Sequence, residues 1–155
     1  MDFTKVVELL KALEREEVEY IVVGGVALNI QGITRATQDI DLFLEPSEGN
    51  IERLKRALRT VWADPEIDTI STADFEGECP NVQYVPPDSK VSLDLLTRLG
   101  DAFRYEDLLW ERKEWSGVRV RIATAQMLYE MKKDTLRLQD KADAAELRER
   151  FGLKE

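Results

Sequence analysis

Two aspartates with one residue between them are the strongest chemical signal in this chain. Asp39 and Asp41 flank Ile40 in an apolar run that continues to Leu44. Because successive side chains of a β-strand point to opposite faces, both carboxylates must lie on one face. Two like charges so close are stable at neutral pH when a divalent cation or a cationic partner lies between them, or when one takes up a proton. The spacing favours a Mg²⁺ or Mn²⁺ site; two solvated acids on an exposed edge strand are the alternative.

Asp94 is the third candidate ligand. In the strand predicted over residues 90–96, apolar and polar residues alternate, so that one face is buried and Asp94 points outward. The separation from Asp41 leaves room for a crossover helix and a hairpin, which would allow the two strands to be neighbours in one sheet. A two-metal site needs several oxygen ligands, and one carboxylate usually serves as the base for an attacking hydroxyl. Asp39, Asp41 and Asp94 are therefore the candidate catalytic and metal-binding residues, although a surface position is the alternative for Asp94 alone.

A glycine pair ends the strand that precedes the acidic run. Gly24 and Gly25 follow an apolar strand predicted from about residue 19 to Val23, and residues 26–30 have a helical pattern. The backbone can turn sharply here without a side chain that would obstruct a ligand, and N–H groups at a helix start suit a phosphate. A simple tight turn is the alternative, because a glycine pair alone is a weak signal. Beside the acidic strand, the pair indicates that a nucleotide phosphate binds next to the metal.

These motifs resemble those of the nucleotidyltransferase superfamily that shares its catalytic core with DNA polymerase beta. That family has an apolar residue before Gly-Gly or Gly-Ser, then about a dozen residues, then Asp-apolar-Asp, with a third acid on a later strand. The link over residues 32–39, with Arg35 and Thr37, resembles the small bacterial and archaeal branch that includes abortive-infection toxin nucleotidyltransferases. The positions that match the family pattern are Val23, Gly24, Gly25, Asp39, Ile40, Asp41, Leu42 and Asp94.

The resemblance extends to the C-terminal segment over residues 127–147. Its matching positions are Lys132, Arg137, Asp140 and Asp143, whereas Gln139 stands where the branch usually has a lysine. The resemblance implies that Lys132 and Arg137 meet the triphosphate or the second substrate. A solvated helix face, with partners at i,i+4 spacing for its lysines and arginines, is the alternative.

The resemblance also implies a fold, a reaction and a cofactor. The expected fold is α/β (α+β), with a mixed β-sheet core flanked by helices over about residues 1–123 and a C-terminal helical pair over about 124–152. The expected reaction moves a nucleoside monophosphate from a nucleoside triphosphate to an unidentified acceptor, which would be an RNA end, a protein or a small molecule. Mg²⁺ or Mn²⁺ would be the cofactor. The candidate nucleotide-binding residues are Gly24, Gly25, Arg35, Thr37, Lys132 and Arg137.

Three alternatives concern the role of the chain. It could modify a partner toxin as an antitoxin-like module, it could be a toxin silenced by a separate antitoxin, or it could bind nucleotides without turnover. Intact acids at all three positions make the last alternative the weakest. Genomic adjacency to a partner gene would discriminate between the first two.

Composition excludes several classes of function. The 155 residues carry a net charge of −9 and a pI near 4.7, which argues against a broad electrostatic grip on nucleic acid. The chain has no histidine and a single cysteine, Cys79, so that zinc chemistry and an internal disulfide are not expected. It has no apolar run of membrane-spanning length and no signal-peptide pattern, so we expect one soluble cytoplasmic domain over residues 1–155 without a membrane partner.

The remaining elements are predicted from hydrophobic period and capping residues. Trp110, Trp115 and Tyr129 are expected to be packing aromatics, with base stacking as the alternative. The elements are an amphipathic helix near 3–13, a helix capped by Ser47 that runs to Trp62, short strands near 67–70 and 82–85 in a region of hairpin and loop, a helix over about 104–112, a strand from Trp115 to Ile122, a helix capped by Thr124, and a last helix over about 140–151 with Gly152 at its C-cap.

Overall fold

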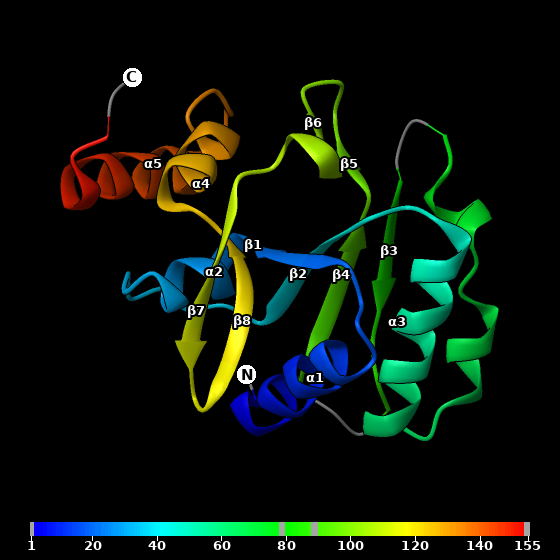
Figure 1. The fold of residues 1–155 in the computed structure, drawn as a ribbon. Helices are drawn as coiled ribbons and strands as arrows, with labels where there is room; N and C mark the ends of the chain where they lie inside the picture. Colours follow the sequence, from blue (N-terminus) through cyan, green and yellow to red (C-terminus); the bar gives the residue numbers. More distant parts are fainter. Residues whose placement is uncertain (1, 78–79, 88–89, 154–155) are drawn as a thin grey trace.

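A single mixed sheet forms the centre of the molecule, as the sequence predicted. The computed structural model describes residues 2–77, 80–87 and 90–153, and Cys79 lies outside them. Within these ranges the large sheet has six strands (Figure 1). In their order across the sheet they are β3 (Asn81–Tyr84), β4 (Ser92–Leu96), β2 (Asp39–Leu44), β1 (Tyr20–Val23), β8 (Val118–Ala123) and β7 (Trp110–Trp115).

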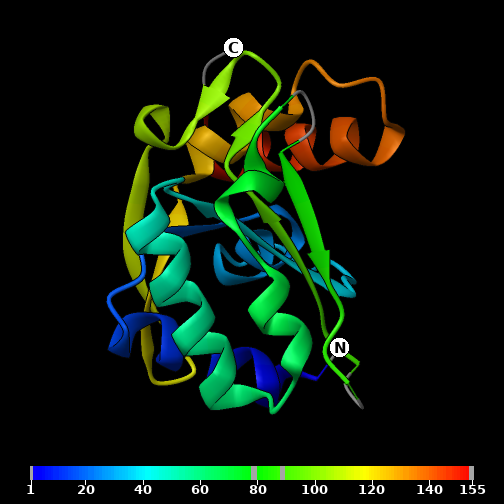
Figure 2. The same cartoon turned by 90° about the vertical axis from the view of Figure 1, so that its right-hand side faces the viewer.

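Helices cover this sheet and one of its ends. In the view of Figure 1, α1 (Phe3–Arg15) and α3 (Glu48–Val61) lie together in front of the sheet, and Figure 2 shows the same pair from the side. The short helix α2 (Gly24–Ile30) directly follows β1 and contacts β1 and β2. The C-terminal pair, α4 (Ala125–Lys132) and α5 (Leu138–Phe151), lies beyond one end of the sheet in both views. The expected helical pair is thus present.

The predicted caps form the helix ends. Ser47 Oγ accepts a hydrogen bond from the Asn50 backbone N–H at 3.2 Å, and Thr124 Oγ1 accepts one from Met127 at 3.1 Å. Gly152 ends α5 in the left-handed conformation, with a φ of +63°. Each cap satisfies backbone groups that the helix itself leaves unpaired. The last helix begins at Leu138, two residues earlier than predicted.

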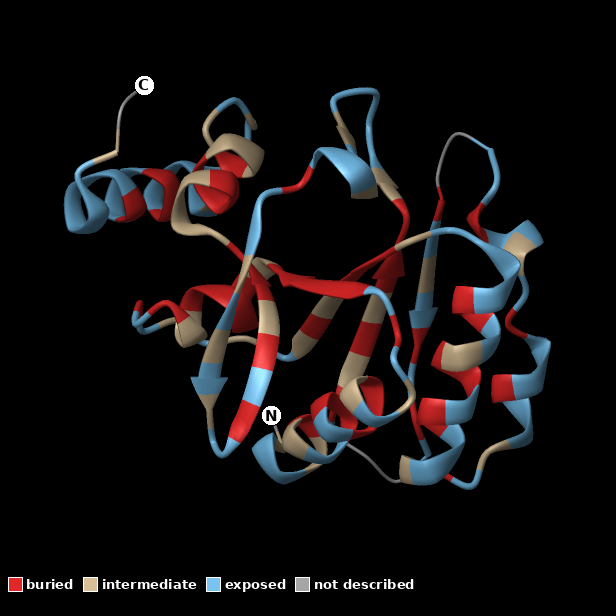
Figure 3. Cartoon of the chain, in the orientation of Figure 1, coloured by how far each residue is buried: buried red, intermediate tan, exposed pale blue. Residues whose placement is uncertain are grey.

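The acidic strand lies inside the sheet and not at its edge. Strand β2 pairs in an antiparallel sense with β1 and in a parallel sense with β4. The alternative of two solvated acids on an edge strand is therefore wrong. Ile40 and Leu42 are fully buried, and β1 is buried along its whole length (Figure 3). A strand with neighbours on both sides and an apolar face in the core has its register firmly specified.

Two predicted elements are wrong. Residues 104–112, expected to be helical, form a short 3₁₀ turn over Tyr105–Asp107 and then the edge strand β7. The residues of β7 alternate between exposed and half-buried and pair with β8 along their whole length, and this pairing outweighs their local helical pattern. The strand expected near 67–70 is replaced by 3₁₀ helices at Pro65–Thr69 and Thr72–Phe75.

The remaining strands form a small hairpin at the same end of the molecule as the helical pair. Strands β5 (Arg98–Leu99) and β6 (Phe103–Arg104) pair with each other directly after β4 (Figure 1). In the described part of the chain, no helix combines the length and apolar character needed to span a bilayer.

Candidate active site

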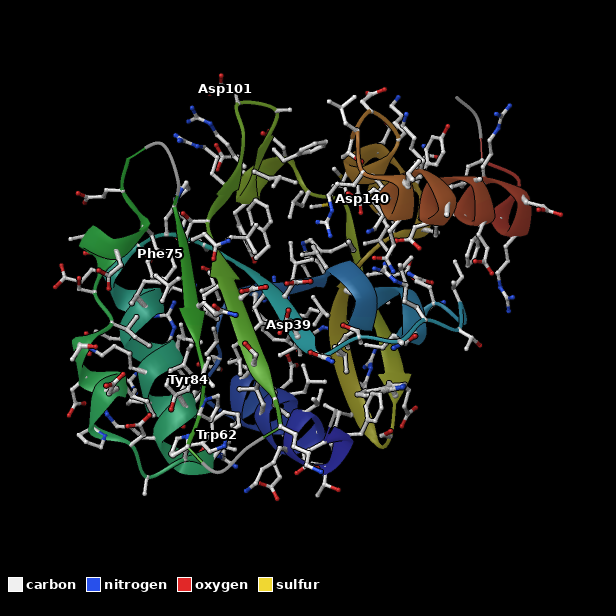
Figure 4. The ribbon with its side chains drawn as sticks, turned by 180° about the vertical axis from the view of Figure 1, so that it is seen from behind. Asp39, Trp62, Phe75, Tyr84, Asp101 and Asp140 are labelled. Atoms are coloured by element: carbon white, nitrogen blue, oxygen red, sulfur yellow. The ribbon has the colours of Figure 1, made fainter. Side chains whose placement is uncertain are left out.

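The sheet register brings Asp41 and Asp94 together. In the parallel pair β2–β4, Asp41 stands directly opposite Asp94, and Asp39 stands opposite Ser92. All three aspartates lie on one face, because residues two apart on a strand share a face and directly paired residues face the same way. Figure 4 views the molecule from behind and shows Asp39 on this face, with Asp140 on the helical pair. The predicted neighbourhood of the two acidic strands is confirmed.

A cavity of about 310 Å³ opens at this face, and only two of the three aspartates line it. Asp41 and Asp94 line it, whereas Asp39 does not. Its walls come from strands β1 to β5 and from the helical pair. The described residues around it are Val23, Gly24, Asp41, Asn81, Asp94, Leu96, Leu99, Leu128, Met131, Lys132, Thr135, Arg137 and Asp140.

The pKa of Asp41 reflects its burial and its short distance from Asp94. Burial, a hydrogen bond with Asp94 and the negative charges of Asp94 and Asp39 together raise its pKa from 3.8 to about 7, while the positive charge of Lys132 opposes the shift. Below about pH 7, Asp41 therefore holds a proton that lets the two carboxylates share a hydrogen bond. This is one of the two ways in which the sequence predicted that such a pair becomes stable.

The glycine pair is required by close approach of the strand that carries the acids. Gly24 has a φ of +70°, and a Cβ atom placed on it would lie 1.9 Å from Asp41 Oδ2. A Cβ atom on Gly25 would lie 2.9 Å from the side chain of Thr37. Thr37 Oγ1 in turn donates a hydrogen bond to the Asp39 carbonyl oxygen at 3.0 Å. The turn and the acidic strand therefore fit each other, and Thr37 shapes the turn from outside the cavity.

Lys132 is buried, which contradicts the alternative that it belongs to a solvated helix face. Only 9% of this residue is exposed, and its Nζ lies 3.0 Å from Asp140 Oδ1 and 3.1 Å from Asp143 Oδ2. Burial acts to raise the pKa of Asp140, but hydrogen bonds from Lys132 and Thr135 and the nearby positive charge bring it below its usual value. Lys132 thus enters the cavity as part of an ion cluster. Lys133, in contrast, agrees with the solvated-face alternative, because its Nζ lies 2.9 Å from Glu130 Oε2 on the surface of the helix.

The two arginines predicted to meet nucleotide are placed differently. Arg137 lines the cavity, has a side chain that is 77% exposed, and lies 3.9 Å from Asp140. Arg35 lies outside the cavity, where its guanidinium forms an ion pair with Asp143. Of the predicted nucleotide-binding residues, only Gly24, Lys132 and Arg137 line the cavity.

Several residues of the cavity wall are not indicated by the motifs of the sequence. Leu128 lies four residues before Lys132 and three before Met131 on α4, so that helical spacing could have indicated Leu128 from Lys132 and Met131 from Leu128. Leu96 follows Asp94 by two residues and shares its face. Asn81 depends on the register of β3 against β4, which no local signal contains.

The three candidate aromatics pack elsewhere. Tyr129 is buried, and Trp115 meets Phe3 edge-on with a centroid distance of 5.9 Å. The Arg121 guanidinium carbon lies 4.1 Å from the ring centroid of Trp110. None of the three lines the cavity; Tyr129 and Trp115 pack as expected, whereas Trp110 is 41% exposed.

The donor set fits a hard divalent cation through two carboxylates. Asp41 and Asp94 offer carboxylate oxygens within hydrogen-bond contact of each other, and the burial and mutual repulsion that raise the pKa of Asp41 would favour a cation between them. In the described residues, no group of three or more histidine, cysteine, aspartate or glutamate side chains is arranged to hold a metal ion. Mg²⁺ commonly takes one or two carboxylates and completes its shell with water and substrate phosphate, which suits a pair.

Comparison with solved structures gives the same fold. A provisionally named nucleotidyltransferase from Thermotoga maritima has a TM-score of 0.59 and 16% identity, over 97% of this chain and 93% of that one. ANT(2″)-Ia in complex with adenylyl-2″-tobramycin has a TM-score of 0.59 and 13% identity, over 96% and 88%. A nucleotidyltransferase-like antigenic protein from Paracoccidioides brasiliensis has a TM-score of 0.54 and 18% identity, over 92% and 74%.

Comparison with sequences identifies the family. A search of curated proteins found no match. The sequence model of the AbiEii nucleotidyl transferase toxin of type IV toxin–antitoxin systems matches residues 8–98, which is more than half of the chain and includes the glycine pair and all three aspartates. This chain therefore belongs to the AbiEii nucleotidyltransferase toxin family, and it is a nucleotidyltransferase.

Proposed function

We propose that this enzyme transfers a nucleoside monophosphate from a nucleoside triphosphate to an acceptor in a metal-dependent reaction, within a toxin–antitoxin system. The observation that carries the proposal is the contact of Asp41 with Asp94 across a parallel strand pair, directly beside Gly24 and inside a cavity. The acceptor oxygen would attack the α-phosphorus, the bond to the β-phosphate oxygen would break, and pyrophosphate would leave.

The carboxylates have distinct roles in this proposal. Asp39 and Asp41 would hold Mg²⁺ or Mn²⁺ together with the triphosphate, and Asp94 would complete the metal site and accept the proton of the acceptor hydroxyl. The bound cation would offset negative charge that develops on the phosphates. Because the pKa of Asp41 is about 7, this group is partly protonated at neutral pH, and metal binding would release that proton.

The opposite wall of the cavity receives the phosphates. A lysine ammonium has three donors, and Lys132 uses two of them on Asp140 and Asp143. Its third donor remains for a phosphate oxygen. Arg137, largely exposed at the cavity, adds a second positive charge, and the backbone of Gly24 and Gly25 allows close approach of the β- and γ-phosphates.

The acceptor belongs to one of three classes: an RNA end, a protein side chain or a small molecule. ANT(2″)-Ia, solved with adenylyl-2″-tobramycin, shows that this fold accommodates a small nucleotidylated product. The net charge of −9 gives no general attraction for RNA. A partner toxin or antitoxin protein would fit the family.

The test uses radiolabelled nucleoside triphosphates, Mg²⁺ and whole-cell extract, followed by identification of every labelled molecule. We expect the wild-type chain to label an acceptor and release pyrophosphate, and Asp94→Asn to lose at least a hundredfold in rate. Asp107→Asn removes an exposed carboxylate that does not line the cavity and should keep wild-type activity. Equal labelling by wild type and Asp94→Asn, or labelling that persists in a chelator, would contradict the proposal.

A further inference from the structure

The ion cluster behind the cavity connects three segments that are far apart in the sequence. Asp143 of α5 is paired with Lys132 at the end of α4 and with Arg35 in the link before β2. Asp140 is the second partner of Lys132. Lys132 and Asp140 line the cavity, whereas Asp143 and Arg35 do not. Asp143 therefore acts from behind the wall.

Burial makes these contacts specific. The side chain of Asp143 is 7% exposed, that of Lys132 is 11% exposed and that of Arg35 is 17% exposed. The two acids and two bases of this cluster balance in formal charge, so each ion depends on the others to remain buried. The Arg35 Nε atom is buried without a hydrogen-bond partner, which leaves Asp143 as the carboxylate that compensates this guanidinium.

We infer that Asp143 is a positioning residue for both halves of the active site, and that Arg35 assists it without touching nucleotide. On one side, Asp143 and Asp140 hold two of the three donors of Lys132, which directs the third donor into the cavity. On the other side, Asp143 fixes Arg35, whose backbone N–H donates to Asn29 Oδ1 at 3.0 Å. The link that carries Arg35 leads directly into Asp39 and Asp41.

This inference rests on the proposed function, because it assigns the triphosphate to Lys132. It reassigns Arg35 from the nucleotide-binding set predicted by sequence to the support of that set. In metal sites, removal of a carboxylate that orients a ligand from behind typically costs tenfold to a hundredfold in affinity, and we expect an effect at the lower end of this range here.

The first experiment measures binding of inorganic tripolyphosphate with Mg²⁺ by calorimetry, so that neither the base nor the acceptor needs to be known. Asp143→Asn keeps the shape of the side chain and removes its charge. We expect this variant to bind tripolyphosphate about tenfold more weakly than wild type. Glu149→Gln removes an exposed carboxylate from the same helix and should bind like wild type. Wild-type affinity in Asp143→Asn would overturn the inference.

A double-mutant cycle separates positioning from general loss of structure. In the Lys132→Ala background, Asp143→Asn should weaken tripolyphosphate binding by less than twofold, because the donor that it orients is gone. A further tenfold loss in that background would overturn the inference. If Asp143→Asn does not fold, Arg35→Gln takes its place: it leaves Lys132 paired, and we expect near wild-type binding with about a tenfold slower turnover, whereas unchanged turnover would contradict the role of Arg35.

The outcomes distinguish the two proposals. A wild-type chain that binds tripolyphosphate in an Asp143-dependent way but labels no acceptor would refute the proposed function and leave the positioning role standing. A chain that labels an acceptor with equal efficiency in wild type and Asp143→Asn would refute the positioning role alone.

Discussion

The carboxyl group of Asp41 couples the stability of the cation-free enzyme to pH. Its pKa is about 7 in the folded chain, whereas an unperturbed aspartate has 3.8. Between these values the folded chain binds more protons than the unfolded chain, so the free energy of unfolding falls as the pH rises through this interval. Above about pH 7 the contribution is lost. The cause is burial of the group beside Asp94.

We therefore predict that Asp41→Asn stabilises the cation-free chain at high pH. The asparagine cannot ionise, so the difference in melting temperature between the variant and wild type should grow from pH 5 to pH 8. An increase of several degrees is expected, because about 1 kcal/mol corresponds to about 3 °C in a chain of this size. Thermal unfolding in a chelator at four pH values measures it. The control Asp107→Asn should follow wild type throughout, and a constant difference for Asp41→Asn would contradict the assignment.

At the scale of elements, the turn between β1 and α2 depends on the absence of a side chain. We predict that Gly24→Ala loses activity at least a hundredfold and costs about 1–3 kcal/mol of stability. Alanine at a φ of +70° is strained, and its Cβ atom would displace the Asp41 carboxylate. Turnover and chemical denaturation measure the two effects.

Gly117→Ala supplies the matched control. Gly117 has a φ of +80° in the connection between β7 and β8, and a Cβ atom there would meet nothing within 4 Å. It should lose a similar amount of stability from strain and keep full activity. If both variants were equally active, the contact between Gly24 and Asp41 would have no catalytic role.

Elements with a strong local pattern were predictable from sequence, and elements that depend on a distant partner were not. The alternation of apolar and acidic residues defined β2 and β4, and Ser47 and Thr124 marked helix starts. Strand β7 is the opposite case, because its pairing with β8 lies outside any local window.

The same distinction applies to the site. Sequence alone indicated the facing acids and the turn at Gly24, since spacing on a strand fixes which way side chains point. The position of Arg35 was not predictable, because its partner Asp143 lies 108 residues away. The burial of Lys132 was not predictable either, because it depends on how α5 packs against α4 and so places Asp140 and Asp143 beside the ammonium group.

At the scale of the whole molecule, bound metal should raise resistance to heat. A cation that binds the folded chain and not the unfolded one stabilises it by about 2.7 kcal/mol at a hundredfold excess over its dissociation constant. We predict that saturating Mg²⁺ raises the melting temperature of wild type by several degrees at pH 8. Asp94→Asn should lose most of this increase, and an equal increase in both proteins would place the binding cation elsewhere.

The central location of β2 separates its two acids from the part of the cavity wall that tolerates substitution. Asp39 and Asp41 lie on β2, which pairs with a neighbouring strand on each side. The far wall of the cavity is instead formed by the β5–β6 hairpin and the segment that joins α4 to α5. Leu136 in that segment and Leu138 at the start of α5 are 92% and 83% exposed, so substitutions there disturb little internal packing. Substitutions in this rim can therefore change the shape of the cavity mouth while the strand that carries Asp39 and Asp41 keeps its place in the sheet.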